Sequence, residues 1–294
     1  MPASHPTSRA ATLIGFVAIA LWAALALMTA ASGVMPPFEL AAITFLIGGG
    51  IGLAYAALRG RLRLLIQPPR VFLVGVGGLF GYHALYFAAL RLAPPAEASL
   101  IAYLWPLLIV LMSALLPGQK LSPPHVIGAL IGFAGAIVLF ASRMGGLSAS
   151  LSAATGLGYA LALGCAFVWS SYSVLSRFLK QAPTEAVAGF CLATSALAAV
   201  CHGLFETTVW PASPGEWAAI VGLGLGPVGL AFYVWDYGVK NGDIRLLGVA
   251  AYAAPVLSTL ILVAAGYAPA TLSLGLACAL IFSGALVASR AGRK

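Results

Sequence analysis

The sequence predicts an all-α polytopic membrane protein in which ten transmembrane helices form two inverted five-helix repeats. Three observations carry this prediction: a composition too apolar to face water, a series of long apolar runs separated by short joints, and a similarity between the two halves of the chain. A membrane-spanning helix needs about 20 mostly apolar residues, and nearly the whole chain consists of such segments.

The composition indicates that the chain lies in a lipid bilayer. Hydrophobic residues make up 62% of the 294 residues and charged residues only 7%, and the mean hydropathy is +1.03. Soluble domains carry about 25% charged residues, so this chain cannot cover a surface that faces water. Backbone groups in lipid must pair internally, which leaves helices or closed barrels. The apolar runs are long and do not alternate with polar residues, which favours helices.

Proline and glycine mark the joints between the predicted spans. The predicted spans cover residues 10–31, 38–58, 71–90, 96–116, 123–141, 155–177, 184–206, 216–238, 245–265 and 269–289. The first run follows Arg9 and precedes Ala30-Ala31-Ser32, which is similar to a signal peptide. The run is too long for the apolar region of a typical signal peptide, so we expect a retained first span.

The basic residues predict the orientation. The chain has 15 Lys and Arg residues. With the N-terminus in the cytoplasm, thirteen of them fall on the cytoplasmic side and only Arg91 and Arg143 fall outside. Because cytoplasmic loops are enriched in Lys and Arg, both termini are expected in the cytoplasm. The net charge of +8 is thereby explained without nucleic acid, since no basic stripe is interleaved with aromatic residues.

An internal repeat is visible in the sequence. A shift of 149 residues places Arg91 on Lys240, Tyr103 on Tyr252, Pro106 on Pro255 and Gly135 on Gly284, and a shift of 147 places Trp22 on Trp169 and Pro36 on Pro183. The repeats cover residues 10–142 and 155–290, with five spans each. Five is odd, so the second repeat enters the membrane from the opposite side. Inverted repeats are typical of secondary transporters with a site near the midplane.

Two motifs and a pair of tryptophans carry a family resemblance. They are Tyr82-His83 followed by Tyr86, the segment Tyr103-Leu104-Trp105-Pro106, and the positions of Trp22 and Trp169. Over residues 10–290 the chain resembles the EamA family of the drug/metabolite transporter superfamily, most closely its bacterial aromatic amino-acid exporters (YddG type). One departure is Gly118-Gln119, where many relatives carry Gly-Glu.

The resemblance implies a function. It implies a secondary transporter of the bacterial inner membrane that exports amino acids, aromatic ones favoured, or similar small metabolites. Alternating access would move the two halves around a central cavity that spans one, three, four, six, eight and nine line. Few carboxylates lie within the spans, so a facilitator and a weakly proton-linked exporter both stay open.

Aromatic and polar side chains deep in the spans are the predicted substrate-binding residues, because Tyr and Trp there need polar partners and favour a cavity over lipid. The set is Trp22, Tyr82, His83, Tyr86, Ser99, Tyr103, Trp169 and Tyr252. Tyr82 and His83 differ between the repeats, where Ala231 and Phe232 replace them, which favours a role in substrate specificity. For His83, a hydrogen bond to the protein, a substrate contact and proton coupling all stay open.

Three residues are predicted to form hinges or gates. Pro106 and Pro255 occupy matching positions, and each kinks its helix by removing a backbone donor. Asp236 is the acid deepest in a span, where it either gates the path or pairs with Lys240 one helical turn later. Near the span ends, Trp235 and Tyr237 are expected in an interfacial belt, and Arg91 is expected to pair with Glu97 near water.

Several classes of function are disfavoured by the motifs that the sequence lacks. It has no phosphate-binding Gly-x-x-x-x-Gly-Lys-Ser/Thr, no His-Glu-x-x-His and no Gly-x-Ser-x-Gly, so neither ATP, a metal nor another cofactor is expected. The four cysteines form no Cys-x-x-Cys pair and are expected to pack as apolar side chains. The alternatives to transport are a lipid-modifying enzyme that uses His83 with a carboxylate, and a membrane sensor or scaffold.

Overall fold

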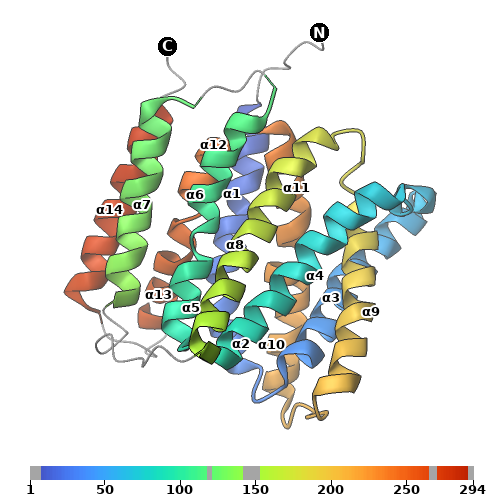
Figure 1. The fold of residues 1–294 in the computed structure, drawn as a ribbon. Helices are drawn as coiled ribbons and strands as arrows, with labels where there is room; N and C mark the ends of the chain where they lie inside the picture. The colour runs from blue at the N-terminus through green and yellow to red at the C-terminus, as the bar shows by residue number, and fades with distance from the viewer. Residues whose placement is uncertain (1–7, 118–120, 142–152, 265–269, 291–294) are drawn as a thin grey trace.

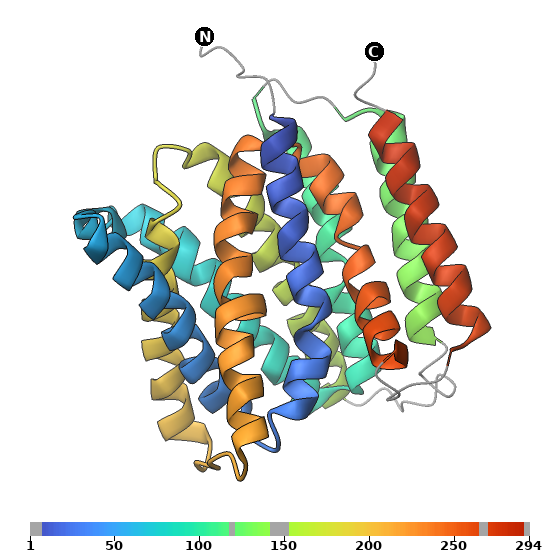
Figure 2. The same ribbon diagram turned by 180° about the vertical axis from the view of Figure 1, so that it is seen from behind.

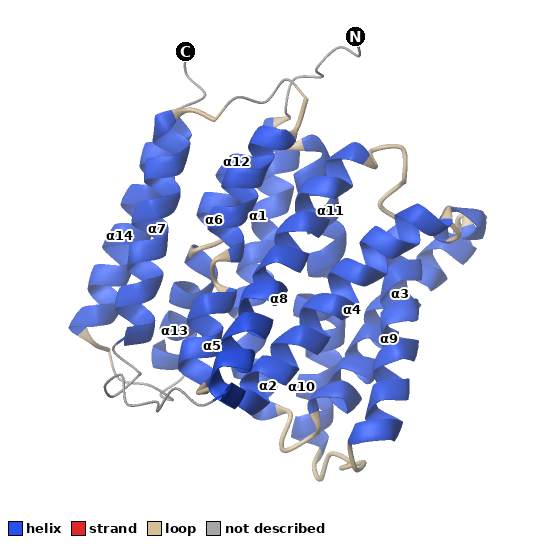
Figure 3. Ribbon diagram, viewed as in Figure 1, coloured by secondary structure: helices blue, strands red, loops and turns tan. Residues whose placement is uncertain are grey.

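The computed structural model describes residues 8–117, 121–141, 153–264 and 270–290, and Gly118-Gln119 lies outside these ranges. Within them the chain folds into helices and has no strand (Figure 3). Eight helical segments are long and apolar enough to cross a membrane, and two shorter apolar helices accompany them. The predicted all-helical, multi-pass class is thereby confirmed.

Within the described residues, each segment predicted as a span overlaps with one helix or with consecutive helices. The helices are α1 (Arg9–Ala23), α2 (Leu25–Ala31), α3 (Pro37–Leu58), α4 (Pro69–Leu92), α5 (Pro95–Ala102), α6 (Trp105–Met112), α7 (Pro123–Ala141), α8 (Ala153–Phe178), α9 (Ala186–Phe205), α10 (Pro214–Leu225), α11 (Ala231–Asn241), α12 (Ile244–Ala250), α13 (Ala253–Ala264) and α14 (Leu272–Ser289). Short 3-10 turns occur at Leu62–Leu65 and Ser113–Leu115, and a π-helical turn, η3, covers Gly226–Leu230.

Four of the long helical segments are interrupted in the middle. The interruptions are Ala24 between α1 and α2, residues 103–104 between α5 and α6, the π-helical turn η3 between α10 and α11, and residues 251–252 between α12 and α13. Pro106 and Pro255 explain two of them, because proline lacks the N–H that would bond to the carbonyl four residues earlier. Those carbonyls belong to Ala102 and Ala251, at the two breaks.

The helices pack in pairs along the bundle. α4 lies along α8, α3 along α9, α1 along α11, and α7 along α14 (Figures 1 and 2). Small residues permit close packing of α7 and α14: a Cβ atom on Gly128 of α7 would lie 2.5 Å from the carbonyl oxygen of Gly284 in α14. The glycines of α7 therefore serve helix packing.

One end of the bundle collects the start of α1 and the ends of α11 and α14. The Ser8 N–H donates to the Asn241 carbonyl over 3.0 Å, which joins the start of α1 to the end of α11. α14 ends at the same level as α1 begins, at the top of Figure 1. The connection between α8 and α9 also lies at this end. The same end thus carries the chain segments that the charge pattern assigns to the cytoplasm.

Candidate functional site

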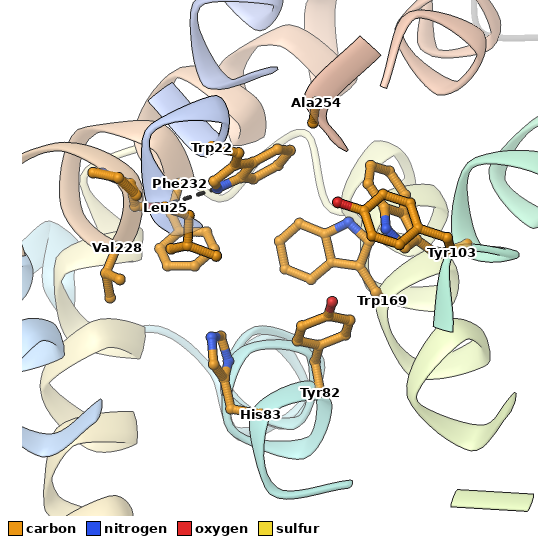
Figure 4. A pocket seen from close by; sticks show the side chains of 11 residues that line it. Trp22, Leu25, Tyr82, His83, Tyr103, Trp169, Val228, Phe232 and Ala254 are labelled. Carbon is orange, nitrogen blue, oxygen red and sulfur yellow. Dashed lines mark hydrogen bonds between the residues drawn. The ribbon is translucent and has the colours of Figure 1, made fainter. Parts of the chain in front are cut away.

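A central cavity of about 100 Å³ lies where the interrupted helices meet (Figure 4). Its lining is almost wholly aromatic and apolar. The lining residues are Trp22, Leu25, Tyr82, His83, Tyr103, Trp105, Trp169, Pro227, Val228, Phe232 and Ala254.

Most of the lining residues lie at or next to the helix interruptions. Trp22 and Leu25 lie on either side of the break at Ala24, Tyr103 lies within the next break, and Trp105 follows it. Pro227 and Val228 belong to η3, and Ala254 follows the break between α12 and α13. Uninterrupted α4 and α8 add Tyr82, His83 and Trp169, and α11 adds Phe232. The lining thus comes from the six spans that the family resemblance implied.

Two side chains bond to the backbone of α6 beside one interruption. The N–H of Leu107, in the first turn of α6, donates to the Tyr252 hydroxyl over 3.1 Å. The Ser170 hydroxyl of α8 donates to the Trp105 carbonyl over 2.9 Å. Such partners are required because unpaired backbone groups are costly inside a bilayer. They hold a non-helical segment beside the cavity.

Four tryptophans form the wall of the cavity and the packing behind it. The ring of Trp22 lies 5.7 Å from that of Trp169, 6.1 Å from that of Trp105 and 5.1 Å from that of Trp235, measured between centroids. The Trp22 Nε1–H donates to the Pro227 carbonyl over 3.1 Å, drawn as the dashed line in Figure 4. Edge-to-face and tilted aromatic pairs at such distances stabilise a fixed ring arrangement.

The polar groups of the cavity come from His83 and two tyrosines. His83 Nδ1 lies 2.7 Å from the Leu79 carbonyl. A carbonyl oxygen accepts only, so Nδ1 carries the proton, and Nε2 is the acceptor of the neutral ring. The hydroxyl groups of Tyr82 and Tyr103 point toward the space beside Trp169 (Figure 4). Among the described residues, no Asp, Glu, Lys or Arg lines this cavity.

Three residues predicted to bind substrate lie outside the lining. Tyr86 and Ser99 are joined by a 2.7 Å hydrogen bond between α4 and α5, and the Tyr86 ring stacks on Tyr82. Tyr252 is fully buried and packs against Gly132 of α7. The structure therefore brings five of the eight predicted residues together: Trp22, Tyr82, His83, Tyr103 and Trp169.

The predicted gate residues have distinct positions. Pro106 and Pro255 follow the two breaks described above. Asp236 lies on α11, one turn beyond the cavity-lining Phe232, and its carboxylate is 2.9 Å from the Lys240 ammonium. The predicted pairing of Asp236 with Lys240 is confirmed. Both side chains are buried, which places the pair inside the protein.

Two predictions about span ends are wrong. Trp235 is fully buried and donates from Nε1 to Ser173 Oγ over 3.1 Å, so it belongs to the core and not to an interfacial belt. Tyr237, two residues later, is exposed on the other face of the helix. Glu97 is buried and accepts a hydrogen bond from the Tyr159 hydroxyl, so it does not pair with Arg91.

Arg91 bonds across the bundle. Its Nη2 lies 3.1 Å from the carboxylate of Glu206 at the end of α9. Glu206 also pairs with His202, whose Nδ1 lies 3.1 Å from the carboxylate. The N–H groups of Phe38 and Glu39 at the start of α3 donate to the same carboxylate. A carboxylate near a helix N-terminus is stabilised by the helix dipole, which explains why Glu206 lies there.

Sequence reasoning missed part of the lining. Leu25, Trp105, Pro227, Val228, Phe232 and Ala254 line the cavity but were not among the predicted residues. Two signals were available: Phe232 is the repeat counterpart of His83, and Trp105 directly precedes Pro106. Leu25, Val228 and Ala254 are ordinary apolar residues, whose types cannot separate a cavity wall from a lipid face.

Comparison with known proteins places the chain in a family. The sequence model of the EamA-like transporter family matches residues 9–141 and again residues 156–290. A protein of Ancylobacter novellus named aromatic amino acid exporter YddG is 59% identical over 285 residues, which cover 97% of this chain and 98% of that protein. A protein of the same name in Escherichia coli K12 is 26% identical over 98% of this chain and 99% of its own length.

A solved structure agrees with these relatives. A crystal structure of a protein 58% identical to this chain superposes with a TM-score of 0.92 and covers 97% of this chain and 98% of its own. The family model covers both halves, and the relatives match over nearly the full length. The chain therefore belongs to the EamA-like transporter family and is a multi-pass membrane transporter, not an enzyme.

Proposed function

We propose that this transporter exports aromatic amino acids, and similar small metabolites, across the bacterial inner membrane. The observation that carries the proposal is the aromatic cavity at the meeting point of four interrupted helices. The names of the relatives, aromatic amino acid exporter YddG, support the same substrate class. An enzyme acting on lipid has no such support, because no described carboxylate lines the cavity with His83.

The cavity chemistry suits an aromatic side chain. Trp22 and Trp169 offer ring faces and edges, and aromatic pairs contribute about 0.5–1.5 kcal/mol beyond the burial of their surface. His83 Nε2 can accept a hydrogen bond, and the hydroxyl groups of Tyr82 and Tyr103 can donate or accept one. These three groups would orient a substrate between the aromatic walls. Their substrate contacts are part of the proposal.

The proposed architecture has ten spans in two inverted repeats, residues 10–142 and 155–290. The double match to the family model supports this division. The helix packing supports it as well, because exchanging the halves converts one close pair into another: α4 with α8 (spans three and six) corresponds to α11 with α1 (spans eight and one). The two halves would rock around the cavity and expose it to each side in turn.

The proposed orientation places both termini in the cytoplasm. The separation of basic residues, thirteen against two, supports it. The position of the start of α1 and the end of α14 at one end of the bundle is consistent with it. Protons are the candidate coupling ion, and facilitated diffusion is the alternative. A pH gradient imposed on vesicles separates the two, because only a proton-linked exporter concentrates its substrate under that gradient.

The proposal is tested with the purified protein in proteoliposomes. Vesicles loaded with unlabelled phenylalanine should take up labelled phenylalanine, tryptophan or threonine from outside by counterflow. Protein-free vesicles and vesicles loaded with buffer alone provide the controls. A lipid analysis of the same vesicles tests the enzyme alternative. Absence of amino-acid counterflow together with a chemically altered lipid would contradict the proposal.

A further inference from the structure

A second, smaller cavity of about 10 Å³ lies one helical turn from the central cavity, toward the end of α11. Three helices, α4, α8 and α11, line both cavities. On α11, Phe232 lines the central cavity, and Asp236 and Lys240 line the second one. On α8, Trp169 lines the central cavity and Tyr172 lines the second. The second cavity thus lies between the central cavity and the proposed cytoplasmic end.

The second cavity contains a buried ion pair. Asp236 Oδ2 lies 2.9 Å from Lys240 Nζ, and the side chains are 1% and 6% exposed. Two contacts come from the connection between α8 and α9. The Thr184 hydroxyl donates to Asp236 Oδ2 over 2.9 Å, and Lys240 Nζ donates to the Ala182 carbonyl over 3.0 Å. Each charge is therefore paired with the other, and each also makes one hydrogen bond to this connection.

The Tyr172 hydroxyl is a third polar group of the same cavity. It is buried and makes no hydrogen bond of normal geometry within the described part of the chain, and Ser176, one turn later on α8, is the polar side chain beside it. A buried hydroxyl without a partner is costly, and so is an ion pair removed from water. Ionisable groups inside a membrane protein commonly mark the path of a substrate or ion. Together these groups form a polar site without an assigned role.

The central cavity leaves a charge problem that this site can solve. An amino acid is a zwitterion, but no described Asp, Glu, Lys or Arg lines the central cavity. The aromatic walls bind the side chain, and the polar groups of His83, Tyr82 and Tyr103 carry no formal charge to pair with the ammonium and carboxylate groups. The ammonium and carboxylate groups would lose their hydration without an opposite charge in return, which is strongly unfavourable.

We propose that Asp236 and Lys240 recognise the two charges of the substrate on its way from the cytoplasm, an inference that rests on the proposed function. The substrate ammonium pairs with Asp236 and replaces the Thr184 hydroxyl and the Lys240 ammonium. The substrate carboxylate pairs with Lys240, replaces the Ala182 carbonyl, and accepts a hydrogen bond from Tyr172. One ion pair within the protein is exchanged for two ion pairs with the substrate, so no charge is left unpaired. A ligand with one charge leaves one of the two residues uncompensated, so the site selects zwitterions.

The wild-type protein provides the first test. Counterflow of labelled phenylalanine is measured against phenylalanine, phenethylamine (no carboxylate) and 3-phenylpropionate (no ammonium). We expect each analogue to inhibit at least about tenfold more weakly than phenylalanine, because leaving one buried charge unpaired weakens binding by more than about a factor of ten. Equal inhibition by all three compounds would overturn the inference. Counterflow without this discrimination leaves the proposed function intact, whereas no counterflow at all refutes the proposed function itself.

Single substitutions then test which of the two residues recognises which charge of the substrate. In Asp236→Asn, Lys240 has no carboxylate partner, so 3-phenylpropionate should inhibit as well as or better than phenylalanine. In Lys240→Gln, Asp236 has no ammonium partner, so phenethylamine should inhibit as well as or better than phenylalanine. A pair that only fastens α11 to the α8–α9 connection would slow all substrates without changing their order, and that result would count against charge recognition.

A matched control lies at the same end of the bundle. Arg61 and Glu185 form an exposed salt bridge of 3.1 Å that lines neither cavity. Glu185→Gln should leave the order of the three inhibitors unchanged, and a changed order would contradict the assignment to Asp236 and Lys240. If the single variants elute as aggregates in detergent, the exchanged pair Asp236→Lys with Lys240→Asp replaces them. It should still discriminate against both analogues, and loss of that discrimination would refute the inference.

Discussion

Trp169 connects the cavity wall with the core behind it. Its ring lies 5.7 Å from Trp22, 5.5 Å from Tyr82 and 5.8 Å from Phe232, measured between centroids. It is 4% exposed, so its position is fixed by neighbours on several helices. A residue in this position can bind an aromatic substrate and also hold the other rings in place.

Replacement of Trp169 by alanine should therefore weaken transport of aromatic amino acids. We expect the KM for phenylalanine to rise about tenfold or more, since an aromatic contact and its buried surface together contribute more than about 1.4 kcal/mol. Phe167→Ala is the matched control, because Phe167 lies on the same helix and is 47% exposed. An unchanged KM in a folded Trp169→Ala protein would show that the cavity assignment is wrong.

His83 permits a separate test of substrate specificity. His83→Phe keeps an aromatic ring, reproduces the residue found at the repeat counterpart Phe232, and removes the Nε2 acceptor. The preference for tryptophan over phenylalanine, measured as a ratio of kcat/KM values, should fall by about fivefold to tenfold, because one hydrogen bond contributes about 1 kcal/mol. An unchanged ratio would assign His83 a purely structural role.

The predicted residues lie in the cavity lining where chemistry and depth agreed. Trp22 and Trp169, which repeat and lie in mid-span, are two of them, and their contact with substrate stays a prediction. Trp235 was misplaced because it lies near the end of its predicted span, where Trp is usually interfacial. The structure buries Asp236 and Lys240 against each other, so their neighbour is buried too. Glu97 was misjudged because its partner, Tyr159, is 62 residues away in the sequence.

At the scale of single elements, the π-helical turn η3 packs closely against α3. The Tyr233 hydroxyl, just after the turn, donates to the Gly48 carbonyl over 2.9 Å. A Cβ atom on Gly48 would lie 2.7 Å from the Gly229 Cα. Such turns are common at functional sites, and here it turns Pro227 and Val228 toward the cavity. The close approach of two backbones explains the glycines at this contact.

Gly48→Ala should destabilise the protein for this reason. We expect a loss of about 1–3 kcal/mol of unfolding free energy, which is typical of an overpacked contact. Gly50→Ala on the same helix is the control, because a Cβ atom there meets nothing within 4 Å. Thermal unfolding in detergent should give a lower Tm for Gly48→Ala and an equal or higher Tm for Gly50→Ala. Equal Tm values for the two variants would contradict the described packing.

The prolines after the two breaks should affect movement more than affinity. Pro106→Ala and Pro255→Ala restore a backbone donor to the carbonyls at residues 102 and 251 and favour a continuous helix. We expect kcat for counterflow to fall severalfold with little change in KM, which steady-state counterflow rates will show. A rise in KM at constant kcat would indicate a binding role in place of a hinge.

The interruptions differ in how far the sequence could reveal them. Two were predicted, because Pro106 and Pro255 each remove one helical hydrogen bond. The break at Ala24 has no sequence signal, since alanine is the best helix former. The structure shows this break beside Trp22, whose side chain is held by a hydrogen bond to the Pro227 carbonyl of η3. Tertiary contacts decide that break, and a single sequence does not contain them in readable form.

At the scale of the whole molecule, composition and segment length were sufficient to predict the all-helical membrane class. The six cavity-lining spans followed from the family resemblance. The second cavity did not, because Tyr172, Asp236 and Lys240 meet Thr184 only after α8, α9 and α11 have packed. Sequence patterns therefore indicated which helices matter, whereas the pairing of buried charges required the three-dimensional arrangement.

The most direct test of the account is counterflow of labelled phenylalanine by the purified wild-type protein and Trp169→Ala, reconstituted at equal density. The account predicts transient accumulation of label in phenylalanine-loaded vesicles with wild-type protein, and a strongly reduced peak at the same substrate concentration with Trp169→Ala. Equal peaks would contradict the aromatic cavity as the binding site. A flat time course for a folded wild-type protein would contradict amino-acid transport itself.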